Sequence, residues 1–177
     1  MRRGQGAIRG EARQDRQSEA GCCTTGFRQE KAIAAAMDVA AEVTARLAGR
    51  EAIDVQRREY DWAFIFADDI GLRVECPWRI LVSGRIALGR DDHGQKFGLS
   101  SAVDGQETSR LLLRNKSVQE VSIRSDTGDL AITFSGHTIL EVLNASSGYE
   151  GWELHTAGLT VIATGGGELA IVRQPKS

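Results

Sequence analysis

A chain of 177 residues, 41% of them hydrophobic, is long enough for one domain with a substantial core and too short for two comfortable ones. Its formal net charge of -2 gives no electrostatic reason to expect a nucleic-acid partner. Its three cysteines follow no disulfide or metal-ligand spacing, and no apolar run approaches the roughly 18 residues of a membrane helix. We therefore expect a cytoplasmic protein that has no cofactor and does not enter a membrane.

Residues 1–28 are rich in arginine, glutamine, glycine and serine and contain almost no large apolar side chains. Such a segment cannot bury enough apolar surface to offset the entropy of ordering, so we predict a disordered tail. Translation from Met37 instead of Met1 would remove this tail, and the sequence leaves the two starts open. We expect residues 29–177 to form a single domain.

A helix is predicted over residues 29–48, because apolar side chains recur there at alternating spacings of three and four. The apolar positions are Ile33, Ala36, Ala40, Val43 and Leu47. Gly49 supplies a C-terminal stop signal, and the neighbouring Arg46 and Arg50 suit the negative end of the helix dipole. We expect the helix to pack on a sheet.

From residue 60 to residue 173 the apolar pattern changes to a period of two, which is typical of half-buried strands. The segments with this pattern are 62–66, 72–74, 78–88, 121–123, 130–134, 139–143, 152–154, 159–163 and 169–172. Short turn signals separate them, and no crossover helix is visible between them. The sequence therefore predicts a mainly β domain, either an antiparallel sandwich or a partly open barrel.

The pattern of residues 62–74 recurs 68 residues later in residues 130–142. Five apolar positions stay in register between the two segments. We therefore predict two repeated hairpin units that bury the same face, with Phe66 equivalent to Phe134 and Val74 equivalent to Val142.

The longest segment without periodicity, Gly89–Gln106, separates the two units, and loops of this length are often functional. Within it, Asp91, Asp92 and His93 offer oxygen and nitrogen ligands for a divalent cation. Joined by Glu150, they would suit a metal-dependent hydrolase. Adjacent residues of an extended loop point apart, however, so a solvated turn is favoured and we predict no metal site.

Two further features receive structural interpretations. Cys76 follows a strand and has no nucleophile motif around it, which favours a structural thiol. The run Gly165-Gly166-Gly167 lies between two strand patterns without a following helix, which favours a flexible turn over a phosphate-binding loop.

The densest cluster of recognition side chains lies in residues 146–154. There, two glycines flank Tyr149 and Glu150, and Trp152 follows at the start of a strand. Tyrosine and tryptophan bury large area while keeping a polar tip, which suits either a core corner or a binding surface. If it is a binding surface, Tyr149 and Glu150 should be exposed above Trp152, with His93 and Phe97 as a second wall.

Several motifs of the β domain resemble those of a family of small uncharacterised bacterial proteins, frequent in actinomycetes. The motifs are Trp62-x-Phe64-x-Phe66, Glu75-x-Pro77-Trp78, His93-Gly94-x-x-Phe97-Gly98-Leu99 and Ser147-Gly148-Tyr149-Glu150-x-Trp152. The resemblance covers about residues 60–172. It implies a bacterial, soluble, β-rich domain and brings no activity, cofactor or catalytic residue with it.

Three functions are compatible with the sequence. The first is a non-enzymatic module, immunity-like or regulatory, that binds another protein through the aromatic and acidic cluster. The second is a carrier whose β domain encloses a small apolar ligand. The residues that would line this cavity are Trp62, Phe64, Trp78 and Trp152. The third and least favoured is the metal-dependent hydrolase, and we predict that the protein is not an enzyme.

Overall fold

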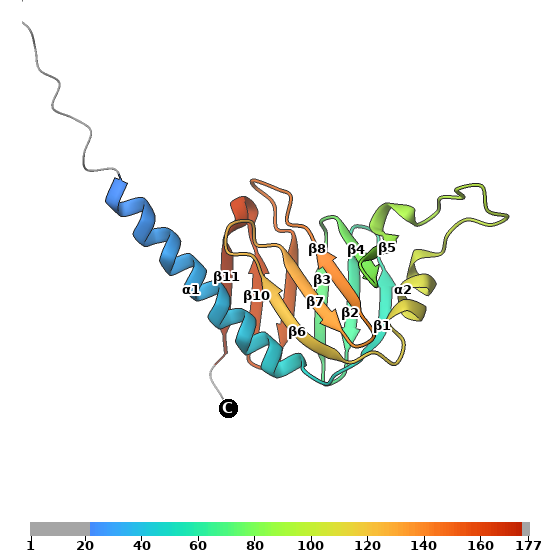
Figure 1. Cartoon of the computed structure of the whole chain (residues 1–177), viewed down its shortest axis with the longest axis horizontal. Helices are drawn as coiled ribbons and strands as arrows, with labels where there is room; N and C mark the ends of the chain where they lie inside the picture. Colours follow the sequence, from blue (N-terminus) through green and yellow to red (C-terminus); the bar gives the residue numbers. More distant parts are fainter. Residues whose placement is uncertain (1–21, 175–177) are drawn as a thin grey trace, which may run out of the picture.

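The computed structural model describes residues 22–174 as two antiparallel sheets packed face to face, with a long helix against one of them (Figure 1). The elements are α1 (Cys22–Leu47), β1 (Ala52–Arg57), β2 (Trp62–Phe66), β3 (Ile70–Val74), β4 (Trp78–Val82), β5 (Arg85–Gly89), the 3-10 helix η1 (Arg90–Asp92), α2 (Gly105–Leu113), β6 (Val118–Ile123), β7 (Leu130–Phe134), β8 (Thr138–Val142), β9 (Trp152–Thr156), β10 (Leu159–Ala163), the 3-10 helix η2 (Gly165–Gly167) and β11 (Leu169–Arg173).

The strand order is β1-β2-β3-β9-β10-β11 in one sheet and β5-β4-β8-β7-β6 in the other. Every strand pair is antiparallel. The predicted mainly β, antiparallel fold is therefore confirmed. Of the two predicted forms, the sandwich is correct, because the two sheets do not close into a barrel.

Two elements lie where the sequence predicts none. Strand β1 has a register shift between Ala52 and Asp54, and Val55 is its one buried residue, so its alternation is weak. Helix α2 occupies the end of the predicted loop 89–106 and the residues after it. The side chain of Asp104 accepts hydrogen bonds from the backbone N–H groups of Gln106 and Glu107 at its start. This N-cap is the one local signal for the helix.

Helix α1 begins at Cys22 and not at Gln29, so the predicted disordered tail is wrong for residues 22–28. Once a helix has nucleated, each added residue gains a backbone hydrogen bond without needing an apolar contact. Residues 1–21 of the predicted tail lie outside the described residues. Of the predicted apolar face, Ile33 is 41% exposed, whereas the face from Ala36 onward is buried.

The C-terminal half of α1 packs on β6, as the expected helix-on-sheet packing requires. Thr44 fixes this contact, because its hydroxyl donates to the carbonyl of Val121 and accepts from the N–H of the same residue. The helix ends at Leu47, and Gly49 follows with a φ of +79°, a left-handed conformation that favours glycine. Within residues 22–174, neither helix combines the length and the apolar character that a membrane crossing requires.

The two predicted hairpins have matching registers and lie in opposite sheets. In β2–β3, Phe66 pairs with Ile70, and in β7–β8, Phe134 pairs with Thr138. The rings of Phe66 and Phe134 stack across the core with their centroids 6.3 Å apart. Each sheet then takes its next strand from the other half of the chain, because β3 pairs with β9 and β8 pairs with β4.

The interior between the sheets is filled by side chains. The ring of Trp78 meets Trp62 and Phe64 edge to face, with centroid distances of 4.9 and 5.3 Å. Trp152 is also buried. Three of the four rings to which the carrier hypothesis assigns a ligand therefore contact one another and the fourth is buried, and this packing gives the hypothesis no support.

The two ends of the sandwich differ in their connections (Figure 1). One end consists mainly of the short turns of four hairpins, β2–β3, β4–β5, β7–β8 and β9–β10. The other end, which we call the loop end, carries the longer connections. These are the segments 58–61, 75–77, 90–104, 124–129, 143–151 and 164–168. Rigid strands that present variable loops at one end commonly carry a binding site there.

Candidate functional site

The structure brings Tyr149, Glu150 and Trp152 together at the loop end. Tyr149 is 82% exposed and Glu150 is also exposed, whereas Trp152 is 2% exposed and lies beneath them at the start of β9. Tyr149 and Glu150 precede β9, so they owe their exposure to the loop and not to strand alternation. Whether they bind a partner stays a prediction.

The loop that carries Tyr149 is held by backbone and side-chain hydrogen bonds. The Ser146 hydroxyl accepts from the N–H groups of Gly148 and Tyr149, at 3.2 and 2.9 Å. The Ser146 carbonyl accepts from the N–H of Gly166 in the neighbouring β10–β11 turn. A Cβ at Gly165 would lie 2.5 Å from the backbone of Gly148, so this glycine permits the two loops to touch. The glycine run forms the hairpin turn between β10 and β11, as predicted, and Gly165 also permits close packing.

Carboxylates gather beside Tyr149 around a single arginine. A guanidinium nitrogen of Arg73 lies 3.0 Å from a carboxylate oxygen of Glu75, and another lies 3.0 Å from Glu153 and 3.8 Å from Glu150. We call Tyr149, Arg73 and these three glutamates the Tyr149 patch. With three carboxylates around one guanidinium, the patch is acidic and partly exposed.

A hollow of about 250 Å³ lies beside Tyr149. Its lining includes Cys76, Arg90, Ser146 and Glu150. Burial raises the pKa of the Cys76 thiol to about 11, an effect that exceeds the opposing influences of a backbone hydrogen bond and the Arg90 charge. A thiol with this pKa is protonated at neutral pH and is a poor nucleophile, which supports a structural role.

The raised pKa of Cys76 predicts a loss of stability at alkaline pH. Folding favours the protonated thiol, so the stabilisation is complete below the unfolded pKa of about 8.5 and is lost as the pH rises through about 11. We expect the unfolding free energy in urea to fall over this interval less steeply in a Cys76→Ala variant than in a Cys76-containing chain, with Cys22 and Cys23 replaced by serine in both. Parallel pH profiles for the two chains would contradict the prediction.

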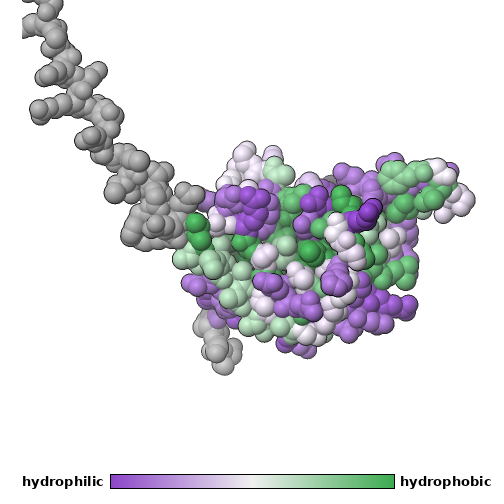
Figure 2. Space-filling view, in the orientation of Figure 1, coloured by the Kyte–Doolittle hydropathy of each residue, from purple (hydrophilic) through white to green (hydrophobic). Residues whose placement is uncertain are grey.

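The predicted second wall differs from the one observed. His93 lines a separate pocket, and Phe97 lines neither hollow. Phe97 is 68% exposed on a loop that projects from the molecule at the upper right of Figure 2, where hydrophobic surface is visible. Arg90, at the start of η1, lines both hollows instead. No local motif marks this arginine, since its role depends on contacts between distant loops.

Two of the side chains proposed as metal ligands, Asp92 and His93, accept hydrogen bonds from backbone N–H groups. One carboxylate oxygen of Asp92 accepts from the N–H of Gly89 at 2.7 Å, and Nδ1 of His93 accepts from the N–H of Gly105 at 3.1 Å. Glu150, the fourth proposed ligand, faces Arg73. In the part of the chain that the structure describes, no three His, Cys, Asp or Glu side chains are grouped so as to hold a metal ion.

Comparison with protein-family models matches residues 61–173 to DUF6188, a family of unknown function. The chain belongs to this family. The match confirms the predicted resemblance to an uncharacterised family, and its limits agree closely with the predicted residues 60–172. It includes β2 to β11 and the whole loop end except the start of the β1–β2 turn, whereas α1 and β1 lie before it. Searches of curated proteins and of solved structures find no match to the chain.

Proposed function

We propose that this DUF6188 protein is a non-enzymatic, bacterial and cytoplasmic binding module that docks another protein on its Tyr149 patch. The observation that carries this proposal is the exposure of Tyr149, a large aromatic side chain held in solvent by a hydrogen-bonded loop at the loop end. Surface aromatic side chains on an ordered loop lose little conformational freedom on binding, and tyrosine is enriched among residues that dominate interface energies.

The charge of the Tyr149 patch indicates the chemistry of the partner. Arg73 neutralises one of the three surrounding carboxylates, so the patch favours a partner with a basic surface. The small hollow beside Tyr149 would accept a side chain of that partner. Protein interfaces commonly combine aromatic residues with a polar, solvent-accessible rim.

Site-specific photo-crosslinking tests this proposal. A photoreactive phenylalanine analogue placed at Tyr149 should give a discrete crosslinked partner in the source cells. The same analogue at Leu111, an exposed residue of α2, should give none. Replacing Tyr149 and Glu150 by alanine should abolish partner binding and change the unfolding free energy by no more than about 0.5 kcal/mol.

The matched control replaces Glu107 and Leu111, an exposed acidic and apolar pair on α2, by alanine. This pair should leave partner binding intact. Loss of folding in the Tyr149 and Glu150 variant, or equal crosslinking from Leu111, would mean that the cluster is a structural corner and would refute the proposed interface.

A further inference from the structure

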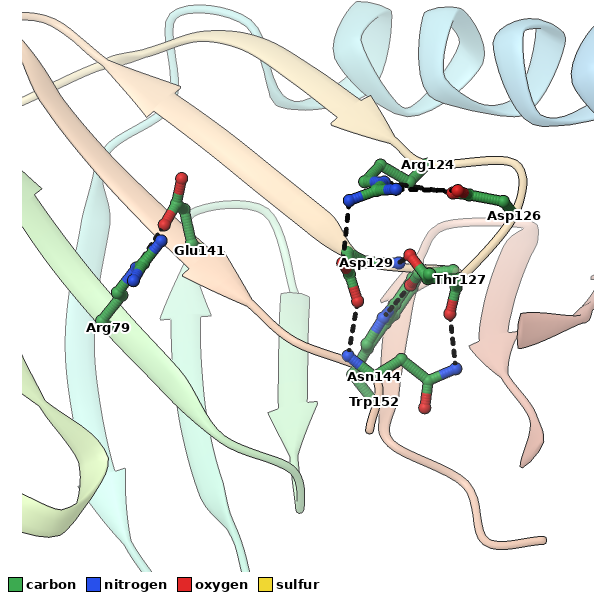
Figure 3. Close-up of polar contacts among 9 residues, drawn as sticks. Arg79, Arg124, Asp126, Thr127, Asp129, Glu141, Asn144 and Trp152 are labelled. Carbon is green, nitrogen blue, oxygen red and sulfur yellow. Dashed lines mark hydrogen bonds and ion pairs between the residues drawn. The ribbon is translucent and has the colours of Figure 1, made fainter. Parts of the chain in front are cut away.

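The loop end of the second half of the chain is closed by a hydrogen-bond network (Figure 3). A carboxylate oxygen of Asp129 accepts from the N–H of Asn144 at 2.8 Å. The Asn144 amide donates to the carbonyls of Thr127 and Thr164, and the indole Nε1 of Trp152 donates to the carbonyl of Gly128 at 2.8 Å. Three connections of the loop end are tied together in this way, while the buried Oδ1 of Asn144 makes no hydrogen bond among the described residues.

Two residues of this network have positional counterparts in the first half. Trp78 begins β4 and pairs with Val142, as Trp152 begins β9 and pairs with Val74. Asp61 directly precedes β2, as Asp129 directly precedes β7. Because the two hairpins share one register, each counterpart occupies the same place in its own half.

In the first half these polar groups have no partners. The buried Oδ1 of Asp61 and the buried Nε1 of Trp78 make no hydrogen bond among the described residues. The turn before β2 comprises residues 58–61, two fewer than the turn 124–129 that supplies the acceptor for Trp152. Native proteins rarely leave buried polar atoms unpaired, and each one that does occur calls for an explanation.

Asp61 lies in the wall of a polar pocket of about 420 Å³, which we call the Asp61 pocket. Its lining includes Arg57, Arg58, Tyr60, Asp61, Arg90 and His93. Trp62 forms a further part of the wall and is backed by the Trp78 ring. The volume falls in the range of small-molecule sites, about 300 to 1,000 Å³.

The charged groups of the Asp61 pocket are incompletely paired with one another. Nε of Arg58 lies 3.8 Å from Oδ1 of Asp61, which is beyond hydrogen-bond distance. Among the described residues, Arg57 and Arg90 have no carboxylate within 4.0 Å. The pocket thus combines a carboxylate whose buried Oδ1 lacks a donor with guanidinium groups that lack an anion.

We propose that the Asp61 pocket binds a zwitterion of the amino-acid or short-peptide class. The ammonium group of the ligand meets Asp61, and its carboxylate meets the lining arginines, which are suited to bidentate recognition of carboxylates. The ammonium group supplies Asp61 with the donor that the backbone N–H of Asn144 supplies to Asp129 in the second half. This pocket shares Arg90 with the hollow beside Tyr149 but none of the residues of the Tyr149 patch, and the proposal stands whether or not that patch binds a protein.

The three tryptophan indole N–H groups report on this site by NMR. In ¹⁵N-labelled protein, with signals assigned from single Trp→Phe variants, titration with glutamate or with Ala-Ala-Ala should shift the Trp62 and Trp78 signals saturably. The Trp152 signal, which arises from the closed network, should stay in place. Asp61→Asn should weaken binding about tenfold or more, because it removes the charge that meets the ammonium group.

Variants and blocked probes complete the test. Arg57→Gln changes an exposed side chain, so it tests the carboxylate contact even where Asp61→Asn does not fold. Asp126→Asn, in the turn of the second half, is the matched control and should leave the affinity within about twofold. Binding of glutamate alone or of the peptide alone supports the proposal and identifies the source. No saturable shift up to about 10 mM, equal binding of Ala-Ala-Ala with blocked termini, or unchanged affinity in Asp61→Asn overturns it.

Discussion

Replacing Phe66 or Phe134 by alanine is expected to lower the unfolding free energy by about 3 to 5 kcal/mol in each case. Both side chains are fully buried, and their rings stack across the two sheets with centroids 6.3 Å apart. Each substitution leaves a cavity between the sheets that the surrounding strands, fixed by backbone pairing, fill only in part. Urea unfolding followed by circular dichroism measures both values.

The same pair tests whether the two halves are equivalent. If they are, the two single variants should lose similar free energy, and the double variant should lose less than the sum because the rings share one contact. The matched control is Val172→Ala on the exposed face of β11, which should cost less than about 1 kcal/mol. A mild effect of one phenylalanine beside a severe effect of the other would contradict the equivalence.

Local periodicity predicted most of the strands, because alternation of apolar side chains directly reflects which face of a strand is buried. The segments 62–66 and 130–134 show this well, since both bury Phe66 or Phe134 together with every second residue before it. Strand β1 was missed because a register shift interrupts its alternation, and α2 because it is short and lies beside a long loop.

The pairing of distant strands could not be predicted. Residue patterns show that β3 and β8 are strands, but they do not show that each pairs with a strand from the other half of the chain. Pairs of opposite charges are the one feature of the sequence that reflects this strand pairing. Arg79 pairs with Glu141 between β4 and β8, and Glu153 pairs with Arg73 between β9 and β3. Opposite charges on outer faces are too common to specify partners without the structure.

The candidate sites likewise include residues that the sequence predicted and residues that it did not. Tyr149, Glu150 and Trp152 were found because they are close in sequence and flanked by glycines. Asp61 and Arg90 were missed because the property that distinguishes them is an incomplete set of contacts, which no sequence pattern records. His93 was predicted to form a second wall beside Tyr149, but it lines the Asp61 pocket, and its Nδ1 accepts from a backbone N–H.

Trp152→Phe is expected to lower the unfolding free energy by about 1 to 3 kcal/mol more than Trp78→Phe does. Both tryptophans are 2% exposed and begin corresponding strands, so the loss of ring volume should cost a similar amount in each. The two tryptophans differ in one hydrogen bond. Nε1 of Trp152 donates to the carbonyl of Gly128, whereas Nε1 of Trp78 has no acceptor among the described residues.

The difference in unfolding free energy lost by the two variants measures the hydrogen bond of Trp152 apart from the packing of its ring. Trp152→Phe leaves the Gly128 carbonyl without its donor, whereas Trp78→Phe removes a donor that is already unpaired. Urea unfolding followed by far-ultraviolet circular dichroism measures both, since the tryptophan signal itself changes. Equal losses, or a larger loss for Trp78→Phe, would show that the Trp78 indole has a partner in solution. The first half of the loop end would then hold one unpaired buried group, Oδ1 of Asp61, instead of two.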